Sequence, residues 1–171
     1  MMSLIARGLL GLYGWKVVGV IPEGLKRCVL IGAPHTSNWD FPVTILAGFA
    51  LKMKVRWLGK DSLFNGVPGL FCQVTGGIPI DRSGAKDTVN QVVGVFKNHE
   101  KIFLTLSPEG TRGKTEFWRS GFYHIAKGAQ VPILLGFVDY KHKVAGIGKV
   151  FAPAGNLLDD MKEIREFYST V

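Results

Sequence analysis

Short apolar runs alternate along the chain with longer segments in which apolar residues recur every three or four positions. The short runs predict buried strands near residues 28–33, 54–58, 76–80, 102–106, 131–138 and 144–151. The longer segments predict helices that begin near Phe41 and that cover residues 87–99, 117–127 and 157–168, with Ser83 as a candidate cap. Strands that alternate with helices in this way indicate an α/β fold, with a mixed, mostly parallel sheet flanked by helices.

The length and the apolar content of the chain are those of a single domain. The sequence has 171 residues, of which 47% are hydrophobic, and this is enough to bury one core. No internal repeat and no Ser/Gly-rich linker divides it. We therefore expect one domain over residues 21–171, preceded by an amphipathic amino-terminal helix over residues 1–20.

The amino-terminal segment combines apolar and cationic residues. Its apolar residues, from Leu4 to Trp15, are interrupted by Arg7, and Lys16 follows, so the segment carries too much charge to span a bilayer. A helix that lies in the membrane interface fits this pattern, and a core helix packed on the sheet fits it equally well. The segment also has no small-residue cleavage pattern typical of a signal peptide.

Residues 62–80 form the longest uncharged stretch in the chain. The stretch is long enough to cross a bilayer, but Pro68, Pro79 and four glycines are incompatible with a simple spanning helix. We therefore expect no spanning segment.

His35 and Asp40 are the first candidate catalytic residues. His35 follows a predicted strand, and Asp40 follows His35 by five positions at the start of a predicted helix. Imidazole exchanges protons near neutral pH, and a carboxylate on its other nitrogen fixes the tautomer and stabilises the imidazolium. A structural interpretation is also open, in which His35 is a loop histidine and Asp40 caps the helix, with Pro42 in its first turn.

A second polar cluster follows the predicted strand over residues 102–106. The run Ser107-Pro108-Glu109-Gly110 has proline and glycine where a type I turn favours them. The turn accounts for these four residues but gives no reason for the arginine at position 112. A guanidinium just beyond such a turn can bind a phosphate through two parallel hydrogen bonds, which a lysine cannot do.

Four blocks of residues, taken in order, resemble the motifs of the glycerolipid acyltransferase family, which includes the lysophosphatidic acid acyltransferases. His35 to Asp40 is similar to the family's H-x4-D motif, and the segment from Lys60 to Ile78-Pro79-Ile80-Asp81-Arg82 is similar to its second motif. Pro108-Glu109-Gly110-Thr111-Arg112 is similar to the P-E-G-T-R motif, and Val131-Pro132-Ile133 is similar to the short fourth motif. The resemblance covers residues 28–138.

The resemblance implies a role for each of these residues. His35 would act as the general base, and Asp40 would orient it. Lys60 and Arg82 would line a phosphate region, although each could otherwise be a solvated surface charge. Acceptor binding is assigned to Glu109, Gly110, Thr111 and Arg112.

The charge of the chain favours an anionic partner. The formal net charge is +8 and the pI is about 9.6. Anionic lipids, the phosphates of coenzyme A and an acidic carrier protein all fit, whereas no nucleic-acid-binding module is recognised, so we expect no nucleic-acid partner. The two cysteines and four histidines show no metal-ligand spacing, so we expect no metal site.

Together these features predict an O-acyltransferase of phospholipid biosynthesis. It would transfer a fatty acyl group from a thioester of coenzyme A or acyl carrier protein to a lysophospholipid, with 1-acyl-sn-glycerol 3-phosphate as the leading acceptor. The thioester supplies the activation, so no cofactor is expected. We expect a cytoplasmic enzyme that associates peripherally with an anionic membrane surface. Two alternatives remain open: an acyltransferase for another lipid acceptor, and a basic non-enzymatic domain that binds anionic membranes or nucleic acid.

Overall fold

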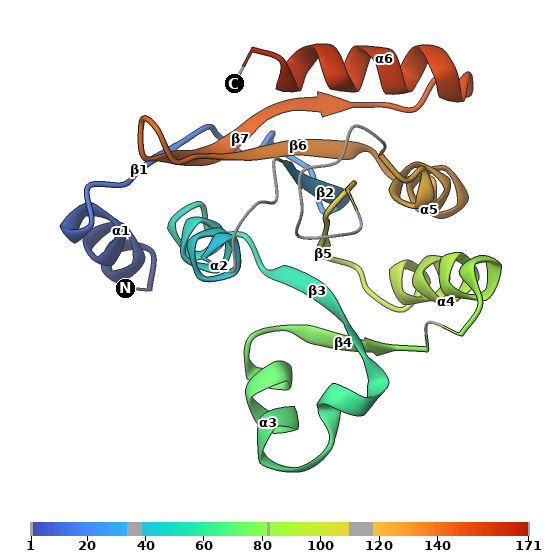
Figure 1. Cartoon of the computed structure of the whole chain (residues 1–171), viewed down its shortest axis with the longest axis horizontal. Coiled ribbons are helices and arrows are strands. Elements are labelled where there is room, and N and C mark those ends of the chain that lie inside the picture. Colours follow the sequence, from blue (N-terminus) through green and yellow to red (C-terminus); the bar gives the residue numbers. More distant parts are fainter. Residues whose placement is uncertain (1, 34–38, 82, 110–117, 171) are drawn as a thin grey trace.

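A sheet with helices on both faces forms the centre of the molecule (Figure 1). The computed structural model describes residues 2–33, 39–81, 83–109 and 118–170. Within these residues the strands are β1 (Lys16–Val18), β2 (Arg27–Ala33), β3 (Val55–Lys60), β4 (Gly77–Ile80), β5 (Ile102–Leu106), β6 (Ile133–Asp139) and β7 (Val144–Phe151). The helices are α1 (Met2–Leu12), α2 (Asp40–Ala50), the short 3-10 helix η1 (Asp61–Phe64), α3 (Gly66–Val74), α4 (Ala85–Lys97), α5 (Gly121–Ala129) and α6 (Leu157–Tyr168).

The strand order confirms the predicted fold class. The described strands form one seven-stranded sheet in the order β1-β7-β6-β2-β5-β3-β4. β6 and β7 pair antiparallel, and the other described neighbours pair parallel. The central strands β2, β5 and β6 are covered on both faces, which explains why they read as continuous apolar runs in the sequence.

Two groups of helices bury the two faces of the sheet. On one face, α4, α5 and α6 pack through residues such as Phe96, Tyr123 and Ile164 against Val29 and Ile31 of β2. On the other face, α2 contributes Val43 and Ala47, and α1 contributes Leu10. The result is a three-layer arrangement in which β2 lies near the middle of the sheet (Figure 1).

Several predicted boundaries need correction. Ser83 does not cap α4: the cap position is Gly84, and the Ser83 hydroxyl instead donates a hydrogen bond to Asp81 at 3.0 Å. The helix predicted over 117–127 begins only at Gly121, because the Arg119 amide donates to the Pro108 carbonyl at 2.8 Å rather than to a helical partner.

The amino-terminal segment also differs from the prediction. Its helix ends at Leu12, and Lys16–Val18 pair with β7 as an edge strand of the sheet. Ala6 and Leu10 of α1 are buried, and the Ser3 hydroxyl donates a hydrogen bond to the Ala50 carbonyl at 2.8 Å. The segment is therefore attached to the domain through one face of α1. Among the described helices, none is both long enough and apolar enough to cross a membrane.

Candidate active site

The described candidate residues, Asp40, Lys60 and Glu109, lie along one edge of the sheet. The register pairs Ile31 with Leu106 and Lys60 with Ile80, so the carboxyl ends of β2, β5, β3 and β4 lie along the same edge. Ala33 pairs with Phe137, which brings the end of β6 to this edge as well. In α/β sheets, ligands bind outside the carboxyl ends of the strands. This edge is therefore where the site is expected.

Asp40 is a buried carboxylate at this edge. It is the first residue of α2 and only 4% of its surface is exposed. Trp39, not Asp40, occupies the cap position, so the structure does not support the capping interpretation. The positive end of the helix dipole favours an anion at this position. The environment thus suits a carboxylate that accepts a hydrogen bond from a neighbouring side chain.

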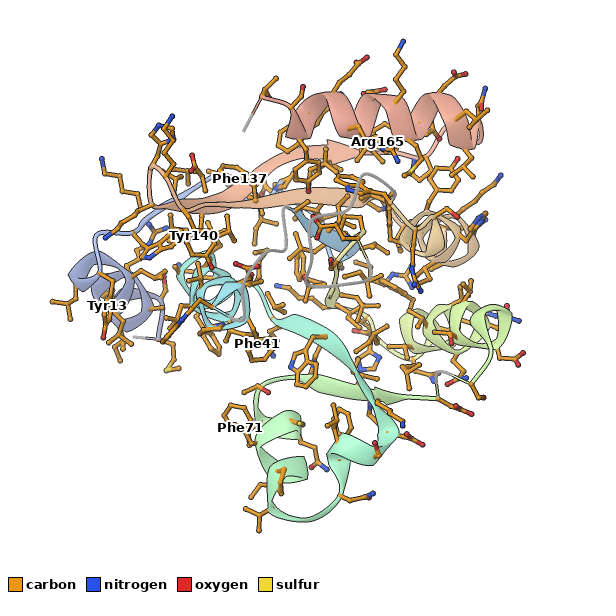
Figure 2. All side chains as sticks on the ribbon, viewed as in Figure 1. Tyr13, Phe41, Phe71, Phe137, Tyr140 and Arg165 are labelled. Atoms are coloured by element: carbon orange, nitrogen blue, oxygen red, sulfur yellow. The ribbon has the colours of Figure 1, made fainter. Side chains whose placement is uncertain are left out.

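Tyr140 holds the Asp40 carboxylate from another element. Tyr140 follows β6 directly, and its hydroxyl donates a hydrogen bond to Asp40 Oδ1. The Tyr140 ring in turn makes an edge-on contact with Trp15, with the ring centroids 5.2 Å apart. Trp15 lies between α1 and β1, so the amino-terminal segment, the end of β6 and the start of α2 meet at this carboxylate (Figure 2).

Glu109 is a second buried acidic group on the same edge. It lies just beyond β5, is 7% exposed, and accepts a hydrogen bond from the Ser107 hydroxyl at 3.1 Å. Tyr168, near the end of α6, donates to the carbonyl oxygens of Gly136 at 2.8 Å and Ile31 at 3.0 Å. Burial, and then the nearby charge of Glu109, raise the pKa of Tyr168, so its hydroxyl remains a donor. The hydrogen bonds of Tyr168 thus join α6 to β2 and β6 at this edge of the sheet.

Of the remaining predicted site residues, the structure describes only Lys60. Lys60 ends β3 at the same edge, and its side chain is exposed. Asp40, Glu109 and Lys60 therefore belong to three elements whose ends meet at one edge. The other predicted residues lie outside the described ranges: His35, Arg82, Gly110, Thr111 and Arg112.

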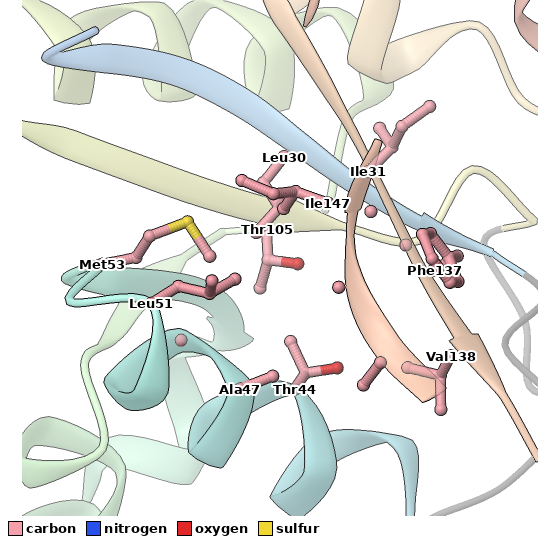
Figure 3. A pocket seen from close by; sticks show the side chains of 15 residues that line it. Leu30, Ile31, Thr44, Ala47, Leu51, Met53, Thr105, Phe137, Val138 and Ile147 are labelled. Atoms are coloured by element: carbon pink, nitrogen blue, oxygen red, sulfur yellow. The ribbon is translucent and has the colours of Figure 1, made fainter. Parts of the chain in front are cut away.

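An apolar cavity lies between α2 and the sheet (Figure 3). Its volume is about 40 Å³, and the empty space reaches about 380 Å³ only when open solvent is included. Thr44 and Ala47 line it from α2, and Gly32 and Leu30 line it from β2. Gly32 lies three residues before His35, and Thr44 lies one helical turn after Asp40. The cavity is thus next to the candidate catalytic segment in both elements.

Neither described cysteine behaves as an obvious nucleophile. Burial raises the pKa of the Cys28 thiol to about 12, which keeps it protonated at neutral pH. Cys72 is partly buried in α3, away from the strand ends described above, and both thiols are free. The described residues also contain no group of three or more His, Cys, Asp or Glu side chains arranged to hold a metal ion.

Two residues at the site were missed from the sequence. Tyr140 follows β6 directly, and no signal in the sequence indicates it, because only the structure shows that β6 pairs with β2. Tyr168 was assigned to the apolar stripe of α6, and nothing in that pattern indicates a hydroxyl that reaches backbone carbonyls of two strands. The Tyr140 ring packs against Trp15 and stays 39% exposed, and in both residues the hydroxyl makes the hydrogen bonds described above.

Comparisons with known proteins agree with the geometry. The acyltransferase family matches residues 14–134, a range that contains Asp40, Lys60 and Glu109. The fold is similar to the crystal structure of the 1-acyl-sn-glycerophosphate acyltransferase PlsC from Thermotoga maritima, with a TM-score of 0.69, 17% identity, and coverage of 97% of this chain and 74% of that chain. A comparison with curated proteins finds no match. Because the family match extends over most of the chain, the chain belongs to the acyltransferase family, as its motifs predicted.

Proposed function

We propose that this acyltransferase transfers a fatty acyl group from an acyl thioester to the hydroxyl of a lysophospholipid, with 1-acyl-sn-glycerol 3-phosphate as the leading acceptor. The acceptor oxygen attacks the thioester carbonyl, a new C–O bond forms, and the C–S bond breaks. The proton from the hydroxyl passes through His35 to the departing thiolate. The high pKa of Cys28 supports direct transfer without an acyl-cysteine intermediate.

The single observation that carries this proposal is the placement of Asp40. A buried carboxylate at the start of α2, five residues after a histidine, suits the role of orienting a general base. The hydrogen bond from Tyr140, which follows β6 directly, holds the carboxylate in place. Asp40 then stabilises the imidazolium that forms when His35 takes the proton.

The acceptor phosphate is proposed to bind cationic residues at the same edge. Arg112 would bind it through two hydrogen bonds, with Lys60 and Arg82 contributing charge. Glu109 supports this arrangement from inside the fold, because its hydrogen bond with Ser107 fixes the turn that leads into residues 110–112. Gly110 and Thr111 belong to the same proposed acceptor site.

The apolar cavity is proposed to hold the acyl chain. Its mostly apolar lining and its position next to His35 and Asp40 in sequence support this assignment. The donor is a thioester of coenzyme A or of acyl carrier protein, and no further cofactor is proposed. The net charge of +8 supports a cytoplasmic enzyme that reaches its acceptor from an anionic membrane surface.

The proposal is tested with purified protein, an acyl thioester of coenzyme A and 1-acyl-sn-glycerol 3-phosphate. Thiol release should require the acceptor and should match the diacyl product found by mass spectrometry. Replacing His35 by alanine should lower kcat by about a hundredfold or more, because a general base acts in the chemical step. His142→Ala is the control, since His142 is exposed and bonded to Asp139 at the same edge.

Three results would count against the proposal. Near-normal turnover by a folded His35→Ala protein would remove the general base. Thiol release without acceptor would indicate a thioesterase. Salt-sensitive binding of nucleic acid with no acyl transfer would favour a binding domain.

A further inference from the structure

The segment between β3 and β4 exposes an unusual number of large apolar side chains. We call these residues the α3 apolar face: Leu63, Val67, Leu70, Phe71 and Val74. Their exposed fractions run from 51% for Leu63 to 85% for Val67. Within α3, Val67, Phe71 and Val74 recur at helical spacing and so share one side of the helix. A surface helix normally turns such a stripe toward the core, and this one presents it to solvent.

The inner side of α3 explains why these side chains point outward. A Cβ on Gly69 would lie 2.1 Å from the Phe64 carbonyl oxygen, and one on Gly77 would lie 2.7 Å from the Cys72 carbonyl oxygen. The helix therefore approaches its neighbours at backbone distance and leaves no room for a large side chain. Trp57 Nε1 donates to the Thr75 carbonyl at 3.2 Å and so fixes the end of α3 to β3. Phe71 projects away from the sheet (Figure 2).

The charges near the α3 apolar face are mostly positive. Residues 62–80 contain no charged side chain, whereas residues 51–60 contain four cations and no acid: Lys52, Lys54, Arg56 and Lys60. A Cβ on Gly76, at the end of α3, would lie 3.3 Å from Arg56 Cδ, and Lys60 immediately precedes η1. A cation thus lies beside the end of α3 and another immediately precedes η1, although Asp61 is also exposed at the start of η1.

The exposed apolar side chains and the nearby cations together indicate what binds the α3 apolar face. An exposed apolar helix with cations beside it fits the interface of an anionic bilayer, in which apolar side chains enter the acyl boundary while cations contact headgroups. A second copy of the chain is less favourable, since each copy carries a net charge of +8 and the copies repel each other. The first residue of the face, Leu63, follows Lys60 by three positions, and Lys60 ends β3 at the edge that carries the candidate site.

We propose that η1 and α3 form a membrane-docking surface that inserts its apolar side chains into an anionic bilayer. The choice of a bilayer rests on the proposed function, in which the acceptor is a membrane lipid. This surface is separate from α1, which lies on the opposite side of α2 from β3 in Figure 1.

The first test compares Leu70→Gln/Phe71→Gln with the wild-type chain in sedimentation with vesicles of phosphatidylcholine and phosphatidylglycerol. We expect the double variant to bind at least about tenfold more weakly, because two large apolar side chains no longer enter the bilayer. Leu158→Gln is the matched control, because Leu158 is 80% exposed on α6 and should leave binding unchanged. Equal binding by the wild type and the double variant would overturn the proposal.

The second test uses the unaltered chain and so does not depend on how a variant folds. Cys72 lies in α3, whereas Cys28 is buried with a pKa raised to about 12, so a polar thiol reagent should modify Cys72 selectively. Anionic vesicles should slow this modification by about fivefold or more if α3 enters the interface. An unchanged rate with vesicle-bound protein would overturn the proposal.

Further measurements distinguish the docking surface from the proposed function and from a dimer interface. Activity on a short-chain acceptor that dissolves as a monomer should stay near normal in the double variant, while activity on vesicle-embedded acceptor falls. If no acceptor is acylated by any form of the protein but vesicle binding still depends on Leu70 and Phe71, the docking surface stands and the proposed function fails. A dimer in analytical ultracentrifugation that the double variant dissolves would instead assign the face to a second copy.

Discussion

Asp40 is a buried carboxylate whose position depends on a residue 100 positions away in the sequence. The hydroxyl of Tyr140 donates to Asp40, and the Tyr140 ring packs against Trp15. A carboxylate that orients a general base must keep one rotamer through the reaction, and a second hydrogen bond restricts it. Under the proposed function, Tyr140 is thus a positioning residue that would act on His35 through Asp40.

Replacing Tyr140 by phenylalanine should lower turnover without weakening substrate binding. The substitution keeps the ring contact with Trp15 and removes only the hydroxyl. A hydrogen bond to a charged group is worth about 1.5–3 kcal/mol, and we expect part of it to appear in the barrier as a fall in kcat of about tenfold. Steady-state kinetics should show little change in KM for either substrate. Tyr13→Phe is the control, because Tyr13 is 74% exposed in the neighbouring segment.

A double-mutant cycle distinguishes positioning from a general structural effect. If Tyr140 acts through Asp40, then Tyr140→Phe should cost little further activity in an Asp40→Asn background. Additive losses in the cycle would show that Tyr140 acts by another route. An equal fall in thermal stability and activity for Tyr140→Phe alone would assign the residue to folding.

The sequence predicts Asp40 but not its partner, and the reason is physical. His35 and Asp40 are close in sequence, so their spacing carries the signal. Tyr140 reaches Asp40 only because β6 pairs with β2 in the sheet, and strand pairing is a long-range property of the fold. Tyr168 shows the same limit, since its hydroxyl bonds to β2 and β6 from the carboxyl-terminal helix.

At the scale of elements, small residues open the space between α2 and the sheet. Gly32, Gly48, Gly136 and Gly146 all line the apolar cavity. A Cβ on Gly48 would lie 2.5 Å from Val55 Cγ2, so that glycine permits close packing. A Cβ on Gly32 would meet nothing within 4 Å, so it would project into open space. Gly32 is therefore the position at which the cavity can be filled without a clash.

Filling the cavity should shift the preferred acyl chain toward shorter lengths. Gly32→Ala and Gly32→Val remove increasing volume next to the candidate catalytic segment. Each buried methylene contributes about 0.8 kcal/mol, so losing room for one or two should change the ratio of kcat/KM between chain lengths by about fourfold to fifteenfold. Competition between acyl-coenzyme A chain lengths, with products identified by mass spectrometry, measures this ratio.

The control for this prediction is Gly94→Ala. Gly94 lies in α4, does not line the cavity, and has nothing within 4 Å of an added Cβ. Its substitution should leave the chain-length ratio unchanged. If Gly32→Val lowers activity equally on all chain lengths, then the cavity does not hold the acyl chain.

Most elements were predicted well because each carries a local pattern. The strand over residues 102–106 and the strand over residues 144–151 agree with β5 and β7 at both ends. β1 was missed, because three residues at a sheet edge are too short to show periodicity. The start of α5 was wrong because a contact with Pro108, outside the segment, holds Arg119 in a non-helical position.

At the scale of the whole molecule, α1 shows how one helix can satisfy both interpretations of its sequence. Ala6 and Leu10 are buried against the domain, as expected for a core helix. Leu4 and Leu12 are 76% and 83% exposed, as expected for an interfacial helix. The amphipathic pattern could not separate the two interpretations, because apolar residues cover more of α1 than its contact with the domain can bury.

Deleting the amino-terminal segment would remove core contacts together with exposed ones, so substitution on its exposed side is the sharper experiment. Leu4→Gln/Leu12→Gln leaves Ala6, Leu10 and the Ser3 hydrogen bond intact. We expect this variant to keep its fold by circular dichroism and to bind anionic vesicles about tenfold more weakly at any salt concentration, because the part of the apolar contribution that α1 makes is lost.

Salt should weaken the electrostatic contribution to membrane binding. The net charge of +8 attracts anionic lipids, and this attraction weakens as the Debye length falls to about 8 Å at physiological ionic strength. Binding of the wild-type chain should therefore decrease with salt but persist, and Leu4→Gln/Leu12→Gln, which keeps the α3 apolar face, should bind about tenfold more weakly than the wild type at each salt concentration. Vesicle sedimentation over a salt series measures the electrostatic and the apolar contributions to binding. Wild-type binding that does not respond to salt would remove the electrostatic contribution, and parallel curves at equal affinity would show that α1 does not enter the membrane.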